Sequence, residues 1–148
     1  MTDLLLIAHA AVTWYMVGLV WFVQVTHYPL FVAVGREGWV DYARRHQTRT
    51  TLVVAPPMLA EICCTALIIA GYAPAAPGLA WSGAVLLLIV WISTFGVQVP
   101  IHTRLAARYD AALVRTLVAT NWVRTFAWTA RAVIAGLMLA DAAEGAAP

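Results

Sequence analysis

Four long apolar stretches alternate with short polar or basic segments along the chain. They cover residues 4–34, 51–72, 79–101 and 121–140. Each is long enough for the roughly 20 apolar residues with which a helix crosses the hydrocarbon core of a bilayer. Backbone groups inside lipid must be satisfied within the protein, which favours helices over open strands. The pattern therefore predicts an all-α fold, an integral membrane four-helix bundle formed by residues 1–148 as a single domain.

Two of the connecting segments, between the first and second stretches and between the third and fourth, are basic and amphipathic. Residues 35–50 place Trp39 and Tyr42 three positions apart, and residues 103–120 repeat that character with leucines and a tyrosine. Apolar and aromatic side chains on one face, opposite arginines, are typical of helices that lie in the membrane interface. We therefore expect an interfacial helix in each segment.

Charge indicates how the bundle is oriented. Only 11% of the residues are charged, against about 25% in soluble domains, which excludes a soluble core. All nine basic residues are arginines, and eight of them lie in or beside the two basic segments. Because cytoplasmic loops are enriched in basic residues, both segments are expected in the cytoplasm and both termini in the periplasm of a bacterial inner membrane. The net charge of +2 then reflects anchoring at membrane lipid rather than nucleic-acid binding.

One spaced motif occurs twice, 75 residues apart. HQTRT at residues 46–50 and NWVRT at residues 121–125 each begin 19 positions after a histidine, His27 and His102 respectively. This repetition predicts an internal duplication in which span, interfacial helix and span occur twice. Because both halves begin and end on the same side of the membrane, such a repeat is parallel and its matching residues lie at one depth. The three histidines of the motif and Asn121 are therefore expected to converge at the cytoplasmic face.

That convergence is the candidate site. Neutral imidazole binds zinc, copper and iron, including haem iron, and a neighbouring amide can orient such a ligand. We assign His27, His46 and His102 as metal ligands for haem or for a transition metal, iron or copper. The arginines nearby would pair with propionates or with an anionic substrate. The expected cofactor-binding residues around the histidines are Gln24, Gln98, Asn121, Arg49 and Arg124.

Two other interpretations of these residues stay open. They can form a hydrogen-bonded polar cap without a cofactor, or they can bind the headgroup of a quinone or another small hydrophobic substrate. The chain has no P-loop, HExxH, GxSxG or Rossmann glycine motif, so no short motif defines a reaction. The expected function is a membrane oxidoreductase or electron-transfer protein. The rival is a non-enzymatic membrane subunit, transport accessory or assembly partner.

Two ionisable residues lie deep inside apolar stretches. Glu61 is in the second stretch and Arg131 in the fourth. A charge at the centre of a membrane helix costs about 2.5 to 3.5 kcal/mol on insertion scales, so such residues usually pair inside the bundle. We therefore predict that Glu61 and Arg131 form an ion pair. It either fixes helix register or, as a catalytic pair, handles protons or anchors a ligand.

Several runs resemble known membrane proteins. WFVQVTHYPLF, VVAPPMLAE, WISTFGVQVPIH and VATNWVRTFAWTAR are similar to a widespread bacterial family of uncharacterised four-span membrane proteins. This resemblance covers nearly the whole chain and implies its fold and location. AHAAVTWYMVGLVWF and APPML resemble parts of the HemJ-type protoporphyrinogen oxidases, small haem-binding membrane proteins, which implies that His9 is a cofactor-binding histidine. The HemJ-type pattern also has a lysine on the third span, and this chain contains no lysine.

Overall fold

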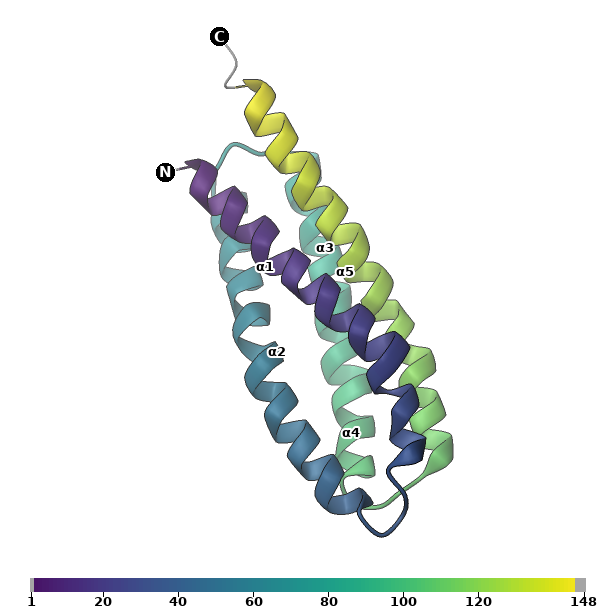
Figure 1. The fold of residues 1–148 in the computed structure, drawn as a ribbon. Helices are drawn as coiled ribbons and strands as arrows, with labels where there is room; N and C mark the ends of the chain where they lie inside the picture. Colours follow the sequence, from purple (N-terminus) through teal and green to yellow (C-terminus); the bar gives the residue numbers. More distant parts are fainter. Residues whose placement is uncertain (1, 146–148) are drawn as a thin grey trace.

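The computed structural model describes residues 2–145 as helices joined by short turns, with no strand in that range. The helices form four rods that run antiparallel to their sequence neighbours (Figure 1). Each rod is long and apolar enough to cross a membrane. The four cover Leu4–Ala33, Trp39–Ile69, Pro77–Leu105 and Ala111–Gly145. The all-α, four-helix class expected from the sequence is therefore confirmed.

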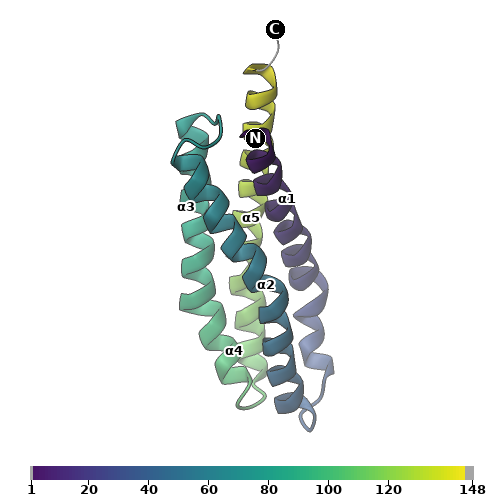
Figure 2. The same cartoon turned by 90° about the vertical axis from the view of Figure 1, so that its left-hand side faces the viewer.

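Short π-helices interrupt two of the rods. The first rod consists of α1 (Thr2–Phe22), the π-helix η1 (Val23–His27) and the 3₁₀-helix η2 (Pro29–Ala33). The third consists of α3 (Pro77–Ser93), the π-helix η3 (Thr94–Gln98) and α4 (Val99–Leu105), which Figure 2 shows as one continuous rod. The second and fourth rods are single helices, α2 (Trp39–Ile69) and α5 (Ala111–Gly145).

A proline explains each π-helix. Tyr28 and Val99 each precede a proline, and each donates its backbone N–H to the carbonyl five residues back, Val23 O and Thr94 O respectively. Proline has no N–H, and its ring crowds the carbonyl four residues before it. The preceding turn therefore widens into the i→i−5 pattern, which often occurs at functional sites. Each widened turn carries one buried glutamine.

The two arginine-bearing turns lie at the same end of the bundle. Residues 34–38 join η2 to α2, and residues 106–110 join α4 to α5, at the lower end in Figure 1. The turn at 70–76 and the start of α1 lie at the other end. Gly71 makes that turn possible, because its φ of 85° falls in the left-handed region that glycine adopts without strain.

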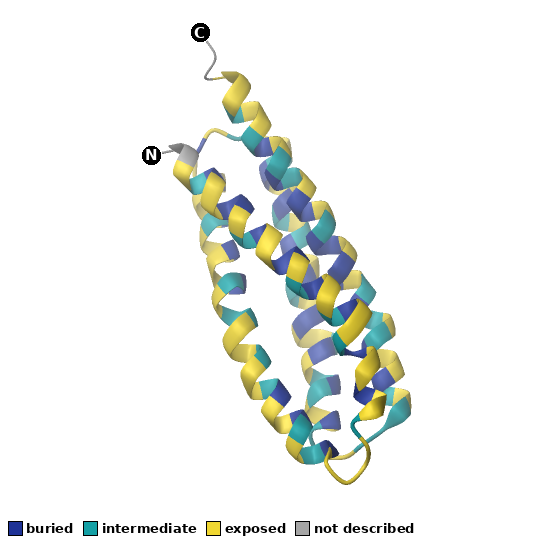
Figure 3. Cartoon of the chain, viewed as in Figure 1, coloured by how far each residue is buried: buried dark blue, intermediate teal, exposed yellow. Residues whose placement is uncertain are grey.

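Buried and exposed positions alternate along every rod (Figure 3). Many polar side chains are buried inside the bundle, and many large apolar ones are exposed on its outer surface. Trp14, Phe22, Leu52, Leu88 and Phe126 are all more than half exposed. A polar interior behind an apolar outer surface suits helices whose solvent is lipid. The buried polar residues are His9, Thr13, Gln24, His46, Glu61, Thr65, Ser93, Thr94, Gln98, Asn121, Arg124, Thr125 and Arg131.

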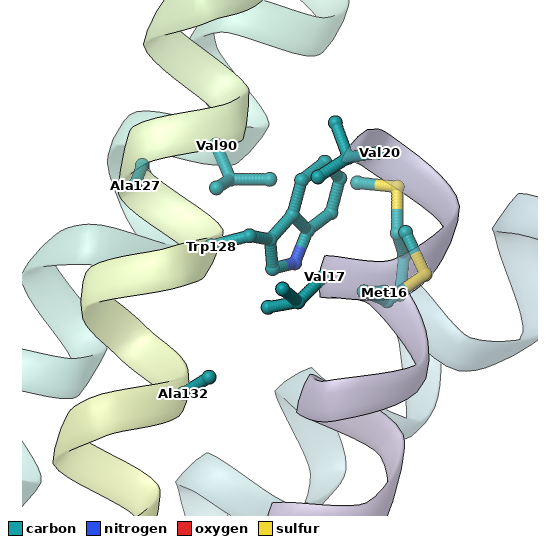
Figure 4. Packing of buried hydrophobic residues seen from close by; sticks show 8 residues of the cluster. Met16, Val17, Val20, Val90, Ala127, Trp128 and Ala132 are labelled. Atoms are coloured by element: carbon teal, nitrogen blue, oxygen red, sulfur yellow. The ribbon is translucent and has the colours of Figure 1, made fainter. Parts of the chain in front are cut away.

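Trp128 of α5 lies at the centre of the apolar core. Its ring packs against Met16, Val17 and Val20 of α1 and Val90 of α3 (Figure 4). A second apolar cluster, around Tyr28, Phe31 and Trp39, closes the end that carries the arginines, and a third closes the opposite end. The interior polar residues are therefore held between apolar layers.

The expected interfacial helices do not exist as separate elements. Residues 39–50 are the first turns of α2, and residues 111–120 are the first turns of α5. Neither segment contains proline or glycine. Trp39, Ala43 and His46 are buried along the same helix face as Glu61 deeper in the rod, so the amphipathic pattern continues directly into the span.

Candidate functional site

Three histidines gather at the end of the bundle that carries the arginines. His27 Nε2 and His46 Nδ1 are 3.0 Å apart, and the ring centres of His46 and His102 are 5.3 Å apart. The three rings come from η1, α2 and α4, and we refer to them as the histidine cluster. The residues that the sequence analysis assigned as metal ligands therefore do lie together.

Aromatic and hydroxyl groups take up much of the space and many of the hydrogen-bonding positions of the histidine cluster. The Tyr28 hydroxyl lies 2.9 Å from His102 Nε2, and the Thr50 hydroxyl lies 3.1 Å from His46 Nδ1. The edge of the Phe31 ring packs against His46 at 5.0 Å between ring centres. The imidazoles are therefore held in place by neighbouring side chains as well as by one another.

This arrangement gives the metal interpretation no support. Within the described residues, no group of three or more His, Cys, Asp or Glu side chains is arranged to hold a metal ion. His27 Nε2 faces His46 Nδ1, and His102 Nε2 faces a tyrosine hydroxyl, so these nitrogens do not point to a common centre. Binding of haem, iron or copper remains a prediction from the sequence.

The amides and Arg124 form a separate chain of hydrogen bonds beside the histidine cluster. Asn121 Nδ2 donates to Gln24 Oε1 at 2.8 Å, and Arg124 Nη1 donates to Asn121 Oδ1 at 3.1 Å. Gln24 Nε2 completes this chain by donating to Val118 O. Gln98 instead donates to the Thr120 hydroxyl at 2.9 Å. The expected amide residues are all buried in the bundle, but none of these bonds goes to a histidine.

A cavity of about 160 Å³ lies between α2 and the η3–α4 part of the third rod. We call it the α2–α4 cavity. Its wall is mostly apolar, with polar groups from His46, His102, Gln98 and Arg124. Gln98 Oε1 and Arg124 Nε are buried and have no hydrogen-bond partner among the described residues. Because buried polar atoms are rarely left unpaired, these two residues in its wall make the cavity a candidate site for a polar group.

The sequence of α2 explains why a cavity exists there. Pro56 and Pro57 lie inside the helix, and together they remove two backbone donors. Helices curve or kink at such positions, and α2 is visibly bowed in Figure 1. Val54, Ala55 and Met58, next to the two prolines, form part of the cavity wall. The proline pair therefore accounts for incomplete packing between α2 and the third rod.

The predicted ion pair is confirmed and lies deeper in the bundle. Arg131 Nε is 3.0 Å from Glu61 Oε1, and both side chains are fully buried. Arg131 also donates to the Gly83 carbonyl and to the Thr65 hydroxyl at 2.6 Å, and its Nη2 lies 2.9 Å from His9 Nε2. These contacts join all four rods. We call Glu61, Arg131, His9, Thr13 and Thr65 the polar hub.

His9 belongs to the polar hub and not to the histidine cluster. Its Nε2 faces Arg131, so the neutral ring carries its proton on Nδ1, which is buried without a partner among the described residues. Arg49 is also outside the α2–α4 cavity. It lines a groove between α2 and the first rod. Of the six expected cofactor-binding residues, Gln98 and Arg124 line that cavity, and the other four do not.

Trp128 connects the polar hub to the cavity, and the sequence analysis did not identify that role. Its Nε1 donates to Glu61 Oε2 at 2.9 Å, and the Arg124 guanidinium carbon lies 5.0 Å from the centre of its ring. The signal in the sequence was the spacing of residues 124, 128 and 131, which places all three on one face of a helix. Tyr28 was missed in the same way, although it directly follows His27.

Comparison with known proteins adds no identification. No protein-family model, curated protein or solved structure matches the chain. The resemblances described from sequence runs therefore remain predictions, and the function is argued from the site itself.

Proposed function

We propose that this chain is an integral membrane protein of a bacterial cytoplasmic membrane that binds a lipophilic molecule with a quinone-type headgroup in the α2–α4 cavity. The arginine-bearing end faces the cytoplasm, and both termini face the periplasm. The apolar outer surface and the positions of the arginines support this placement. One observation carries the ligand proposal: Arg124 and Gln98 both line one apolar cavity, and each has a buried polar atom, a donor and an acceptor respectively, with no partner among the described residues.

The size of the cavity fits a single ring. An apolar cavity of about 150 Å³ holds one benzene molecule, and this one measures about 160 Å³. Drug-sized ligands need about 300 Å³ or more, so a headgroup would enter while its tail remains outside. Phe95 and Val99 line the cavity and are exposed on the outer surface. An apolar tail can therefore run from the headgroup past these residues into lipid.

The chemistry of the wall suits a headgroup that alternates between carbonyl and hydroxyl. A carbonyl oxygen accepts a hydrogen bond from Arg124 Nε–H, and a hydroxyl donates one to Gln98 Oε1. The imidazoles of His46 and His102 also line the cavity and can accept or return a proton. This pairing supports a role in proton-coupled redox chemistry at the membrane, in line with the oxidoreductase expectation from the sequence.

A direct test is titration of the detergent-purified protein with a short-chain benzoquinone. We expect saturable binding that weakens in Arg124→Gln and in Gln98→Met. Hydrogen bonds to charged groups contribute about 1.5 to 3 kcal/mol, so Arg124→Gln should weaken binding about tenfold to a hundredfold. Gln98→Met removes the acceptor and keeps a side chain of similar shape. Because Gln98 donates only to the Thr120 hydroxyl among the described residues, this change should disturb the fold little. Arg115→Gln, an exposed arginine on the same helix, serves as the matched control.

Two results would reject the quinone proposal: no saturable binding to the wild-type protein, or wild-type affinity in both cavity variants. The same preparation tests the haem or metal alternative, which the sequence analysis favoured. Stoichiometric iron or copper, or a haem absorption band, that disappears in His27→Ala, His46→Ala and His102→Ala would establish that alternative. If neither quinone nor metal binds, the non-enzymatic membrane subunit is the better explanation.

A further inference from the structure

A second recess lies between α2 and the first rod, and it shares His46, Thr50 and Val54 of α2 with the α2–α4 cavity. Its volume is about 420 Å³, and we call it the α1–α2 groove. Its wall has two zones. Arg45, Arg49 and His27 lie toward the arginine-bearing end, and Leu19, Phe22 and Val53 lie deeper along the rods. Since a helix rises 1.5 Å per residue, Val53 is about 6 Å deeper than Arg49 along α2. The groove is therefore basic at its outer end and apolar inside.

The basic zone has charge that the protein does not neutralise. Among the described residues, no carboxylate lies within ion-pair distance of Arg49. Arg45 pairs with Asp41 at 2.8 Å, but both side chains are about 70% exposed, and exposed pairs of this kind contribute little. No residue that lines the groove is acidic. The outer end of the groove can therefore attract an anion.

We infer that the α1–α2 groove binds an anionic phospholipid, with its phosphate at Arg45 and Arg49 and one acyl chain along Leu19, Phe22 and Val53. Basic pockets between membrane helices on the cytoplasmic side are suited to anionic headgroups. A free phosphate ion would leave the apolar zone uncovered, and a zwitterionic lipid would gain less from two arginines. The inference rests on the membrane placement proposed above, but it does not depend on a ligand in the α2–α4 cavity.

The test measures lipid binding to the full-length protein in a neutral detergent by native mass spectrometry. The probes are a phosphatidylglycerol and a phosphatidylcholine with identical acyl chains. We expect one phosphatidylglycerol to bind saturably and more tightly than phosphatidylcholine. An arginine near an anionic lipid contributes about fivefold in affinity, so Arg45→Gln/Arg49→Gln should weaken phosphatidylglycerol binding about thirtyfold. Arg44→Gln is the matched control, because Arg44 is exposed on the same helix and does not line the groove.

Three results would overturn the inference: equal affinity for the two lipids, equal losses in Arg44→Gln and in Arg45→Gln/Arg49→Gln, or displacement of the lipid by millimolar inorganic phosphate alone. Equal affinity for the two lipids would mean that the headgroup charge does not matter. Equal losses in the variants would mean that binding does not occur in the groove. Displacement by phosphate would mean that the acyl chain does not contribute. Val53→Trp should reduce phosphatidylglycerol binding by filling the apolar zone without changing the charge. The arginine variants should still bind quinone like the wild type, since Arg49 does not line the α2–α4 cavity. Quinone titration therefore tests the α2–α4 proposal separately from lipid binding.

Discussion

Replacing one partner of the Glu61–Arg131 pair should destabilise the bundle strongly, and replacing both should cost less than the sum of the single changes. Both side chains are fully buried, so neither charge is screened by solvent. Glu61 accepts hydrogen bonds from Thr13, Trp128 and Arg131. Glu61→Gln keeps the shape of the side chain but removes the charge that these donors stabilise, and it leaves the guanidinium without a counter-ion.

The expected magnitude follows from this geometry. Removing one partner of a buried pair costs about 3 to 5 kcal/mol, because the other charge is left uncompensated. Contacting residues have coupling energies of about 0.5 to 3 kcal/mol. Because the two side chains are in direct contact at 3.0 Å and completely buried, their coupling energy should lie near the upper end of this second range. We therefore expect a coupling energy of about 2 to 3 kcal/mol between Glu61→Gln and Arg131→Gln.

The assay is a double-mutant cycle on the free energy of unfolding, measured by denaturant titration in one detergent. Asp41 and Arg45 provide a matched control, because they form an ion pair at 2.8 Å on an exposed helix face. Their coupling energy should stay below about 1 kcal/mol. If Glu61→Gln and Arg131→Gln were additive within about 0.5 kcal/mol, the two side chains would be energetically independent and the reasoning would be refuted.

Two further predictions concern topology and the packing of the polar hub. In a cysteine-free background, Ala107→Cys should be protected from an impermeant thiol reagent in intact cells and Ala76→Cys should react; the reverse pattern would invert the proposed orientation. Gly83→Ala should give less than the roughly 1 kcal/mol that a Gly→Ala change can contribute in a helix, because the new Cβ would lie 3.4 Å from Arg131 Nη1, which the Gly83 carbonyl holds in place. Gly136→Ala, which meets nothing within 4 Å, should instead stabilise α5 by up to about 1 kcal/mol; equal effects of the two changes on unfolding would contradict this account.

The rods and the buried ion pair could be predicted because lipid restricts both strongly. An apolar stretch of about 20 residues has few alternatives to a helix, and the four candidate spans match that expectation. An ionisable residue within such a stretch needs a partner. Glu61 and Arg131 are a carboxylate and a guanidinium deep in the apolar stretches, and the structure joins them. The interfacial helices were predicted less well, because amphipathicity alone does not show where a helix begins.

The separation of His9 from the histidine cluster can be predicted from the sequence. His9 and His27 lie on the same rod, 18 residues apart, which is about 27 Å at 1.5 Å per residue. Two groups so far apart along one rod cannot serve a single small site. The common helix face of His9, Thr13 and Gln24 indicated that these residues are interior, but it gave no information on depth. The resemblance that assigned His9 to a cofactor also carried no information on its neighbours.

The duplicated motif predicted a location better than it predicted contacts. His46 lies against His27, as the first copy suggests, but Asn121 bonds to Gln24 and not to His102. His102 faces Tyr28 instead. His27, Gln24 and Tyr28 all lie on or next to η1. Asn121 and His102, from the second copy, therefore both contact the first rod and do not pair with each other as His27 and His46 do. The spacing of residues in the sequence does not reveal such pairings.

Trp128 makes the polar hub and the α2–α4 cavity parts of one structure. Glu61 accepts its indole N–H at 2.9 Å, while Arg124 lies over the ring at 5.0 Å. A carboxylate at the indole N–H increases electron density in the ring, and a ring richer in electrons attracts a guanidinium more strongly. The charge of Glu61 therefore helps to hold two arginines on one face of α5, one by direct contact and one through the indole. A carboxylate that does not itself line the cavity thus adds to the hydrogen bond from Arg124 to Asn121 in holding Arg124 in the cavity wall.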